Sequence, residues 1–136
     1  MVLGLFTWND SPAYNHREID IEFSRWGQVN NQNAQYVVQP YSTTGNIVRW
    51  QQPALSQSTH EFNWQSASIA FQSIVGLLGT PSQGPVVQQW TYPGTDNPVP
   101  GGENARVNLW LYNGSAPTNG QPVEVIINRF EFVQAT

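Results

Sequence analysis

The chain has 136 residues, which is enough for one domain and too short for two. Only 10% of the residues are charged, Lys and Cys are absent and the formal net charge is −4, which argues against a nucleic-acid partner, an anionic membrane surface, a disulfide framework and a thiolate metal site. The hydrophobic fraction of 39%, with six Trp, argues against general disorder, and no apolar run is long enough for a transmembrane helix.

Short apolar, aromatic and β-branched runs, separated by eleven Gly and ten Pro, predict an all-β chain. In chain order, strands are expected over residues 2–8, 17–26, 34–41, 46–51, 60–64, 68–74, 86–92, 105–111 and 123–133. Loops are expected over 76–85, 94–104 and 113–122. No segment carries an apolar stripe at helical spacing, so we expect two packed antiparallel sheets and less than about a tenth helix.

The segment REIDIEF, residues 17–23, alternates acidic and apolar side chains. Successive side chains of a strand point to opposite faces, so one face is predicted to carry Ile19, Ile21 and Phe23. The opposite face is then predicted to carry His16, Glu18, Asp20 and Glu22. A solvated edge strand would explain a lone acidic run. Here three of the nine acidic residues of the chain fall within five positions, between bulky apolar neighbours, which favours a functional row.

Glycoside hydrolysis is the chemistry that such a row suits. Most glycosidases need one carboxyl group that donates a proton and a second that acts as nucleophile or base. A third carboxylate between them raises the pKa of its neighbours, and the three then titrate as a coupled set. Residues four apart on a strand are roughly 13 Å apart at Cα, whereas a retaining enzyme needs carboxyl groups about 5–5.5 Å apart. A concave sheet is therefore expected, on which the two Glu side chains lean inward.

The stretch GLFTWNDSPAYNHREIDIEFSRWG resembles the catalytic region of glycoside hydrolase family 16, which includes bacterial lichenases, laminarinases and plant xyloglucan endotransglycosylases. The family signature is E-[I/V/L]-D-x-(x)-E, and EIDIE is its unbulged form. Downstream, HEFNW, ARVNLW and PVEVIINRFEFV resemble later strands of the family in the same order. The resemblance therefore extends over nearly the whole chain.

This resemblance implies a concanavalin-A-like jelly roll with a substrate cleft across the concave sheet. It implies that Glu18 is the nucleophile, Asp20 an assisting acid and Glu22 the general acid/base. Further residues matched to the cleft, and so to substrate binding, are Phe6, Trp8, His16, Gln35, Gln39, Asn108 and Trp110. Three positions depart from the family pattern, because Arg17, Val37 and Gln39 stand where Asp or Asn, Asn and Tyr are usual.

The expected function is that of a retaining, endo-acting glycoside hydrolase that cleaves a β-glucan-like polysaccharide. A transglycosylase on the same scaffold and a non-catalytic carbohydrate-binding sandwich are the alternatives, and the departures leave the polysaccharide open. A cupin-like metal site at His16 and Glu18 is disfavoured, because the only other His is His60 and there is no His-x-His pair. The sequence implies no cofactor and leaves a structural calcium ion open.

Glu18, Asp20 and Glu22, called the acidic row below, begin at residue 18, whereas in the family several strands precede the corresponding acids. We therefore expect a single domain, 1–136, that lacks N-terminal strands and pairs with a missing N-terminal segment or another chain. Unpaired sheet edges and uncovered apolar faces are the expected consequences. No signal peptide is visible, although a polysaccharide substrate favours a secreted, extracellular protein.

Overall fold

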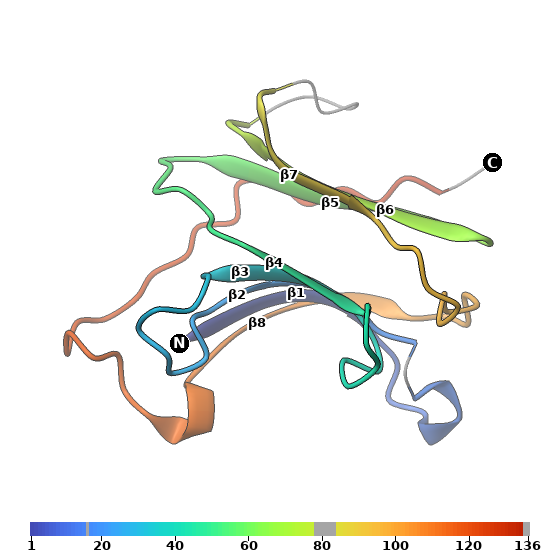
Figure 1. The fold of residues 1–136 in the computed structure, drawn as a ribbon, viewed down its shortest axis with the longest axis horizontal. Helices are drawn as coiled ribbons and strands as arrows, with labels where there is room; N and C mark the ends of the chain where they lie inside the picture. The colour runs from blue at the N-terminus through green and yellow to red at the C-terminus, as the bar shows by residue number, and fades with distance from the viewer. Residues whose placement is uncertain (16, 78–83, 135–136) are drawn as a thin grey trace.

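The computed structural model describes residues 1–15, 17–77 and 84–134, and this part of the chain is all-β. Its helical content is confined to two short 3-10 turns, η1 (Pro12–Tyr14) and η2 (Tyr112–Gly114). Eight strands form two antiparallel sheets that lie one above the other (Figure 1). The expectation of two packed antiparallel sheets with little helix is confirmed. Within the described ranges, no helix is long and apolar enough to cross a membrane.

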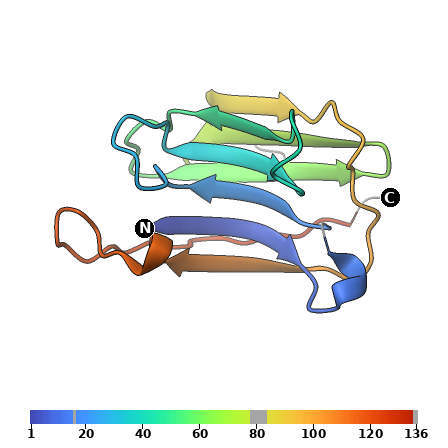
Figure 2. The ribbon, with the colours of Figure 1, turned by 60° about the horizontal axis from the view of Figure 1, so that its bottom comes forward.

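The larger sheet has the strand order β4-β3-β2-β1-β8, and the smaller sheet has the order β5-β6-β7. The bounds in the larger sheet are β1 (Val2–Trp8), β2 (Ile19–Phe23), β3 (Ala34–Val38), β4 (Ile47–Trp50) and β8 (Asn104–Trp110). Those in the smaller sheet are β5 (Ser58–Gln65), β6 (Ser68–Val75) and β7 (Val86–Thr91). The first eight expected strands are therefore confirmed, with shifted ends. Figure 2 shows the strands of the larger sheet running side by side.

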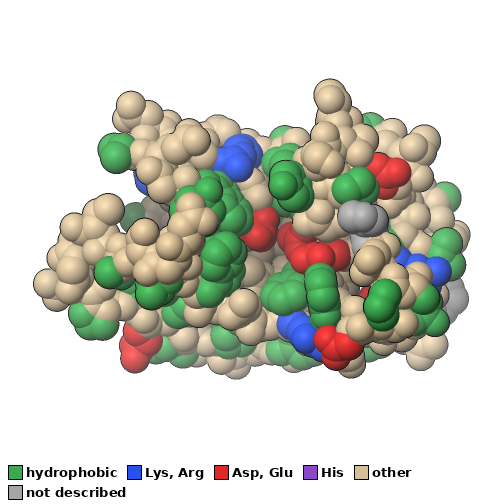
Figure 3. All heavy atoms as spheres, turned by 90° about the horizontal axis from the view of Figure 1, so that it is seen from below, with side chains coloured by type: hydrophobic (Ala, Val, Ile, Leu, Met, Phe, Trp, Pro, Cys, Tyr) green, Lys and Arg blue, Asp and Glu red, His purple; other side chains and the backbone are tan. Residues whose placement is uncertain are grey.

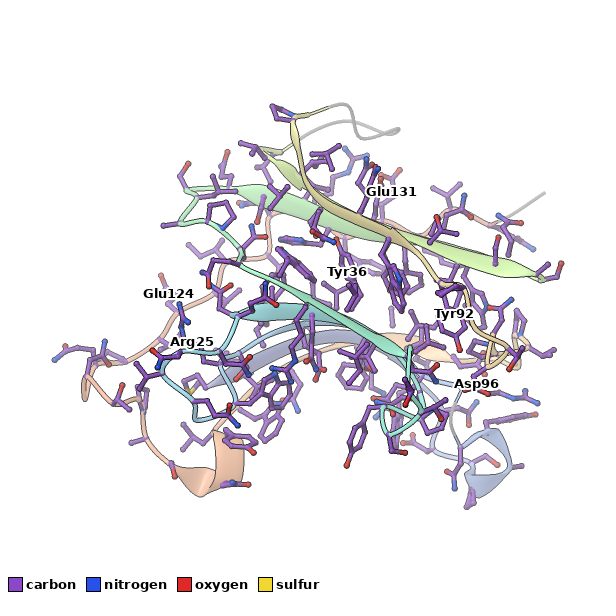
Figure 4. All side chains as sticks on the ribbon, viewed as in Figure 1. Arg25, Tyr36, Tyr92, Asp96, Glu124 and Glu131 are labelled. Atoms are coloured by element: carbon purple, nitrogen blue, oxygen red, sulfur yellow. The ribbon has the colours of Figure 1, made fainter. Side chains whose placement is uncertain are left out.

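The core lies between the sheets and is rich in aromatic side chains. Ile19 and Ile21 of β2 are 0% and 2% exposed, so the predicted apolar face of REIDIEF packs inward. Tyr36 of β3 lies between the two sheets (Figure 4). Its ring centroid is 4.7 Å from that of Phe71 and 4.2 Å from that of Trp50. These contacts join both sheets around one aromatic centre, and each such ring buries a large apolar area.

A series of hydrogen-bonded polar side chains also crosses the core, beginning at the Tyr36 hydroxyl. The Tyr36 hydroxyl is 2.6 Å from Ser73 Oγ, which is 2.8 Å from Nδ1 of His60. Nε2 of His60 is in turn 2.8 Å from Ser58 Oγ. Both ring nitrogens of His60 are thus hydrogen-bonded, as buried polar groups must be. Burial lowers the pKa of His60 to about 4, so His60 is neutral at neutral pH and serves the fold.

This burial predicts that stability falls in mild acid. His60 has a folded pKa of about 4, against 6.5 when unfolded, so the unfolded chain binds more protons between these values. The free energy of unfolding therefore falls as the pH drops through this window, and we expect His60 to contribute a loss on the order of 2 kcal/mol. Urea unfolding at several pH values measures it, with His60→Gln as the non-titrating control. Parallel pH profiles for the two proteins would contradict the prediction.

A second polar cluster anchors the loop that follows β7. The Tyr92 hydroxyl donates to Asn46 Oδ1 at 2.8 Å and accepts from the backbone N–H of Asp96 at 3.1 Å. Asn46 Nδ2 donates to Asp96 Oδ2 at 2.8 Å. Figure 4 shows Tyr92 and Asp96 at this end of the sandwich. The cluster ties the loop after β7 to the start of β4 across the two sheets.

The prediction of a strand over residues 123–133 is wrong for this structure. Residues 121–134 carry no strand and pair with none of the eight strands. The apolar alternation of the segment is real, but a strand requires hydrogen bonds to a neighbouring strand, and this segment forms none. Its large side chains therefore stay in solvent, with Ile126 70%, Phe130 67% and Phe132 79% exposed.

The smaller sheet covers only part of the larger one. A cavity of about 2690 Å³ lies between β1 and β8 on one side and β5 on the other. Apolar side chains of both sheets line it, together with residues 124–134; they include Leu3, Leu5, Phe62, Trp64 and Val107. Val107 is 53% exposed although it points to the inner side of its sheet.

Candidate functional site

The acidic row lies on the face of the larger sheet that points away from the smaller sheet. In the β1–β2 pairing, Asp20 is opposite Phe6 and Glu22 is opposite Gly4. Paired residues share a face, so these four lie on the side opposite Ile19. Figure 3 shows this face, with acidic side chains at its centre in a hollow between hydrophobic side chains. Gly4 has no side chain, and the Phe6 ring lies 3.5 Å from the position that a Cβ of residue 4 would take.

Asp20, in the middle of the row, is 3% exposed. Its Oδ2 accepts a hydrogen bond of 3.1 Å from Gln39 Nε2, and its carboxyl group is also hydrogen-bonded to that of Glu18. Burial, followed by the charges of Glu18 and Glu22, raises the pKa of Asp20 well above its usual value. Asp20 therefore keeps its proton where an ordinary Asp has lost it.

Glu22, at the opposite end of the row from Glu18, accepts a hydrogen bond of 2.6 Å from Gln35 Nε2. Burial and the charge of Glu18 raise the pKa of Glu22, while Gln35 and the charge of Arg49 lower it. The charge of Glu18 thus affects the pKa of Glu22 although four positions separate the two residues. The pKa values of Asp20 and Glu22 are thus both raised, and a carboxyl group with a raised pKa can act as a proton donor.

Most residues expected to bind substrate share this face. Gln35 is opposite Glu22, Asn108 is opposite Gly4 and Trp110 is opposite Val2. The backbone N–H of Gln39 donates to the Glu18 carbonyl oxygen, which continues the β2–β3 ladder. The ring centroids of Phe6 and Trp8 are 6.4 Å apart, and Trp8 is 37% exposed. His16 lies outside the described residues.

Aromatic side chains lie at both ends of the acidic row. At the Glu18 end is a cavity of about 230 Å³, lined in part by Trp8, Tyr14, Arg17, Glu18, Gln39 and Tyr41. At the other end, Trp26, Trp110 and Tyr112 form a cluster with centroid separations of 5.6–6.3 Å. Rings in such positions suit the apolar faces of sugars. The row is therefore the centre of a groove with an aromatic surface at each end.

Four of these residues were not expected at the site. Tyr112 continues the period-two series of Asn108 and Trp110 past the end of β8, a signal that the sequence does contain. Arg49 is opposite Gln35 and could have been found from the pairing of β3 with β4. Tyr14 and Tyr41 lie in a 3-10 turn and a loop, where side-chain direction has no period to reveal it.

The buried Asp20 carboxyl predicts a cost in stability. Its folded pKa exceeds its unfolded pKa, so the folded chain binds more protons and the free energy of unfolding falls as the pH rises through the folded value. Asp20→Asn has the same shape and does not titrate. We expect it to raise the free energy of unfolding at neutral pH by about 1–2 kcal/mol, with the gain disappearing in acid.

Urea unfolding at neutral and acidic pH measures this effect, and Asp10→Asn is the matched control. Arg106 lowers the pKa of Asp10 through a hydrogen bond of 2.8 Å, so removal of that carboxylate has the opposite sign. A destabilised Asp20→Asn protein at neutral pH would contradict the prediction.

No metal site emerges from the described part of the chain, where no group of three or more His, Asp and Glu side chains is arranged to hold an ion. Searches with this chain against protein-family models, curated proteins and solved structures found no match. Its interpretation therefore depends on the geometry of the groove.

Proposed function

We propose that this protein is a retaining, endo-acting glycoside hydrolase that cleaves internal bonds of a β-linked polysaccharide. One observation carries the proposal: three carboxyl groups lie in a row in an open groove, and the middle one is buried, with its pKa raised by burial and by the charges of the other two. A binding protein gains nothing from three acids that repel one another, whereas double displacement uses two carboxyl groups, and a third beside them can change their pKa values. The aromatic side chains at both ends of the row support a long carbohydrate rather than a small substrate.

In the proposed reaction, the Glu18 carboxylate attacks the anomeric carbon while the Glu22 carboxyl group gives its proton to the leaving glycosidic oxygen. The Glu22 carboxylate then takes a proton from water, the water oxygen attacks the anomeric carbon, and the bond to Glu18 breaks. Asp20 donates a hydrogen bond to Glu18 and adds no negative charge. The pKa of Glu22 is raised by burial, which suits a group that must hold its proton near neutral pH.

We propose that the protein belongs to glycoside hydrolase family 16, because EIDIE resembles the family signature and HEFNW, ARVNLW and PVEVIINRFEFV resemble later strands of the family. The proposed fold is then a concanavalin-A-like jelly roll, and we propose that further strands complete it beside β5 and β8. The apolar side chains around the cavity support this, since Val107 lies on the inner side of β8 and is still 53% exposed.

This proposal predicts that residues 1–136 expressed alone self-associate. Exposed apolar faces and unpaired strand edges pair readily with other chains. Size-exclusion chromatography over a range of concentrations measures the assembly, and thermal melting measures its cooperativity. A compact monomer with a cooperative melt and full activity would contradict it.

The proposed function is tested by incubation of the protein with lichenan, laminarin, xyloglucan, agarose and carrageenan, followed by measurement of new reducing ends and product length. We expect one of them to be cut into oligosaccharides. Labelled acceptor oligosaccharides in the same assay separate hydrolysis from transglycosylation. Tight binding without any bond cleavage would instead identify a carbohydrate-binding sandwich.

A further inference from the structure

The side chain of Gln39 is held at both ends of its amide. The backbone N–H of Tyr41 donates to Gln39 Oε1 at 2.8 Å, and Gln39 Nε2 donates to Asp20 Oδ2 at 3.1 Å. A backbone N–H can only donate, so the amide oxygen must face Tyr41. The NH₂ group must then face Asp20, and the orientation of this amide follows from the chemistry of its partners.

This orientation decides where the Asp20 proton lies. An NH₂ group only donates, so the Asp20 oxygen beside Gln39 must accept and does not carry the proton toward it. The proton of the buried carboxyl group is left on Oδ1, available for the hydrogen bond between Asp20 and Glu18. That bond then runs from Asp20 to Glu18, with the Glu18 carboxylate as acceptor.

No other charged side chain in the described residues competes for Asp20. Its neighbours across the sheet, Val37 on β3 and Phe6 on β1, are apolar. Arg106 lies one strand further away and binds Asp10. The charges that face Asp20 are therefore those of Glu18 and Glu22 on its own strand.

We infer that Gln39 is a positioning residue that keeps the Asp20 proton directed at Glu18, so that Asp20 always donates a hydrogen bond to the nucleophile. This inference rests on the proposed function for its catalytic meaning, but the hydrogen-bond arrangement exists without it.

Gln35 is held differently from Gln39. It lies on the same face four residues earlier and donates to Glu22, but its own Oε1 is buried without a partner. The orientation of the Gln35 amide therefore follows from one partner, Glu22, whereas that of Gln39 follows from two.

Gln39→Glu is the variant that isolates this role, because it keeps the shape and still offers an oxygen to the Tyr41 N–H. Its second oxygen faces Asp20 as an acceptor, which draws the Asp20 proton to Oδ2 and away from Glu18. Glu18 then ionises less readily. We expect the acidic limb of the pH profile of kcat/KM to move to higher pH and kcat to fall roughly ten- to a hundred-fold, the effect of one charge-assisted hydrogen bond.

Two comparisons separate this role from a structural one. Asp20→Asn in the presence of Gln39 places its amide oxygen toward Gln39 and its NH₂ toward Glu18, which imitates the protonated carboxyl group. The inference therefore predicts that Asp20→Asn loses less activity than Gln39→Glu, although Asp20 is the nearer residue to the chemistry. Gln35→Glu, the matched control, is expected to move the alkaline limb set by Glu22 and to leave the acidic limb in place. The reverse order of the first two losses would overturn the inference.

A titration tests the same arrangement without any activity. Protein labelled with ¹³C at Glu side-chain carboxyl groups gives signals for six residues, and Glu18→Gln assigns the one of interest. In Gln39→Glu we expect the Glu18 signal to titrate at higher pH than in the unaltered protein, with circular dichroism unchanged. An unchanged Glu18 titration would overturn the inference whether or not the protein is a hydrolase. A shifted titration in a protein that cuts no polysaccharide would support the arrangement and refute the proposed function.

Discussion

Glu18→Gln is expected to reduce turnover of polysaccharide by at least about a thousand-fold while the protein stays folded. The amide has the size of the carboxylate but no charge, so it cannot form the covalent bond to the anomeric carbon. The substitution also removes a negative charge beside the buried Asp20, whose raised pKa reflects that charge. The melting temperature should therefore be equal to or above that of the unaltered protein.

Initial rates, together with circular dichroism of the same samples, measure this effect. Glu124→Gln is the matched control, because Glu124 is an exposed carboxylate on the segment after β8, away from the groove. A Glu18→Gln protein with a tenth or more of the original rate would show that Glu18 is not the nucleophile.

Glu22→Ala is expected to lose activity on polysaccharide to a similar degree. On an aryl glycoside, added azide is expected to restore the activity of this variant. An aryl leaving group departs without a proton donor, so the glycosyl-enzyme still forms on Glu18. Water then attacks slowly because its base is missing. Azide needs no base and fits the space left by the side chain, which adjoins Gly4.

The product distinguishes the two glutamates. With Glu22→Ala, azide enters after the covalent step and gives a glycosyl azide of retained configuration. With Glu18→Ala, azide replaces the nucleophile itself and gives the inverted azide. Proton NMR of the azide products reads the configuration directly, and the opposite pattern would exchange the assigned roles of Glu18 and Glu22.

The sequence predicts those parts of the site that follow from period two. Alternation in REIDIEF correctly places Ile19 and Ile21 in the core and Asp20 and Glu22 on the open face. Asn108 and Trp110, which were expected from the family resemblance, lie on the same face, because they are opposite Gly4 and Val2. The period-two predictions work because each depends on one strand at a time.

What the sequence does not predict depends on contacts between elements. The arrangement of Gln39 needs the turn that brings the Tyr41 N–H to its amide oxygen, and no spacing encodes this turn. The buried chain from Tyr36 to His60 joins two sheets and reads in the sequence as unrelated residues. Residues 123–133 show the opposite failure, because their alternation is correct for a strand but the neighbour that would pair with them is not beside them.

The configuration of the first-formed product tests the central claim most directly. Proton NMR recorded within minutes of adding enzyme to the polysaccharide that it cuts shows which anomer appears first, before mutarotation mixes the two. Double displacement through Glu18 and Glu22 predicts the β-anomer at the new reducing end, the configuration of the bond that was cleaved. Initial release of the α-anomer would mean single displacement by water and would contradict the account of the acidic row given above.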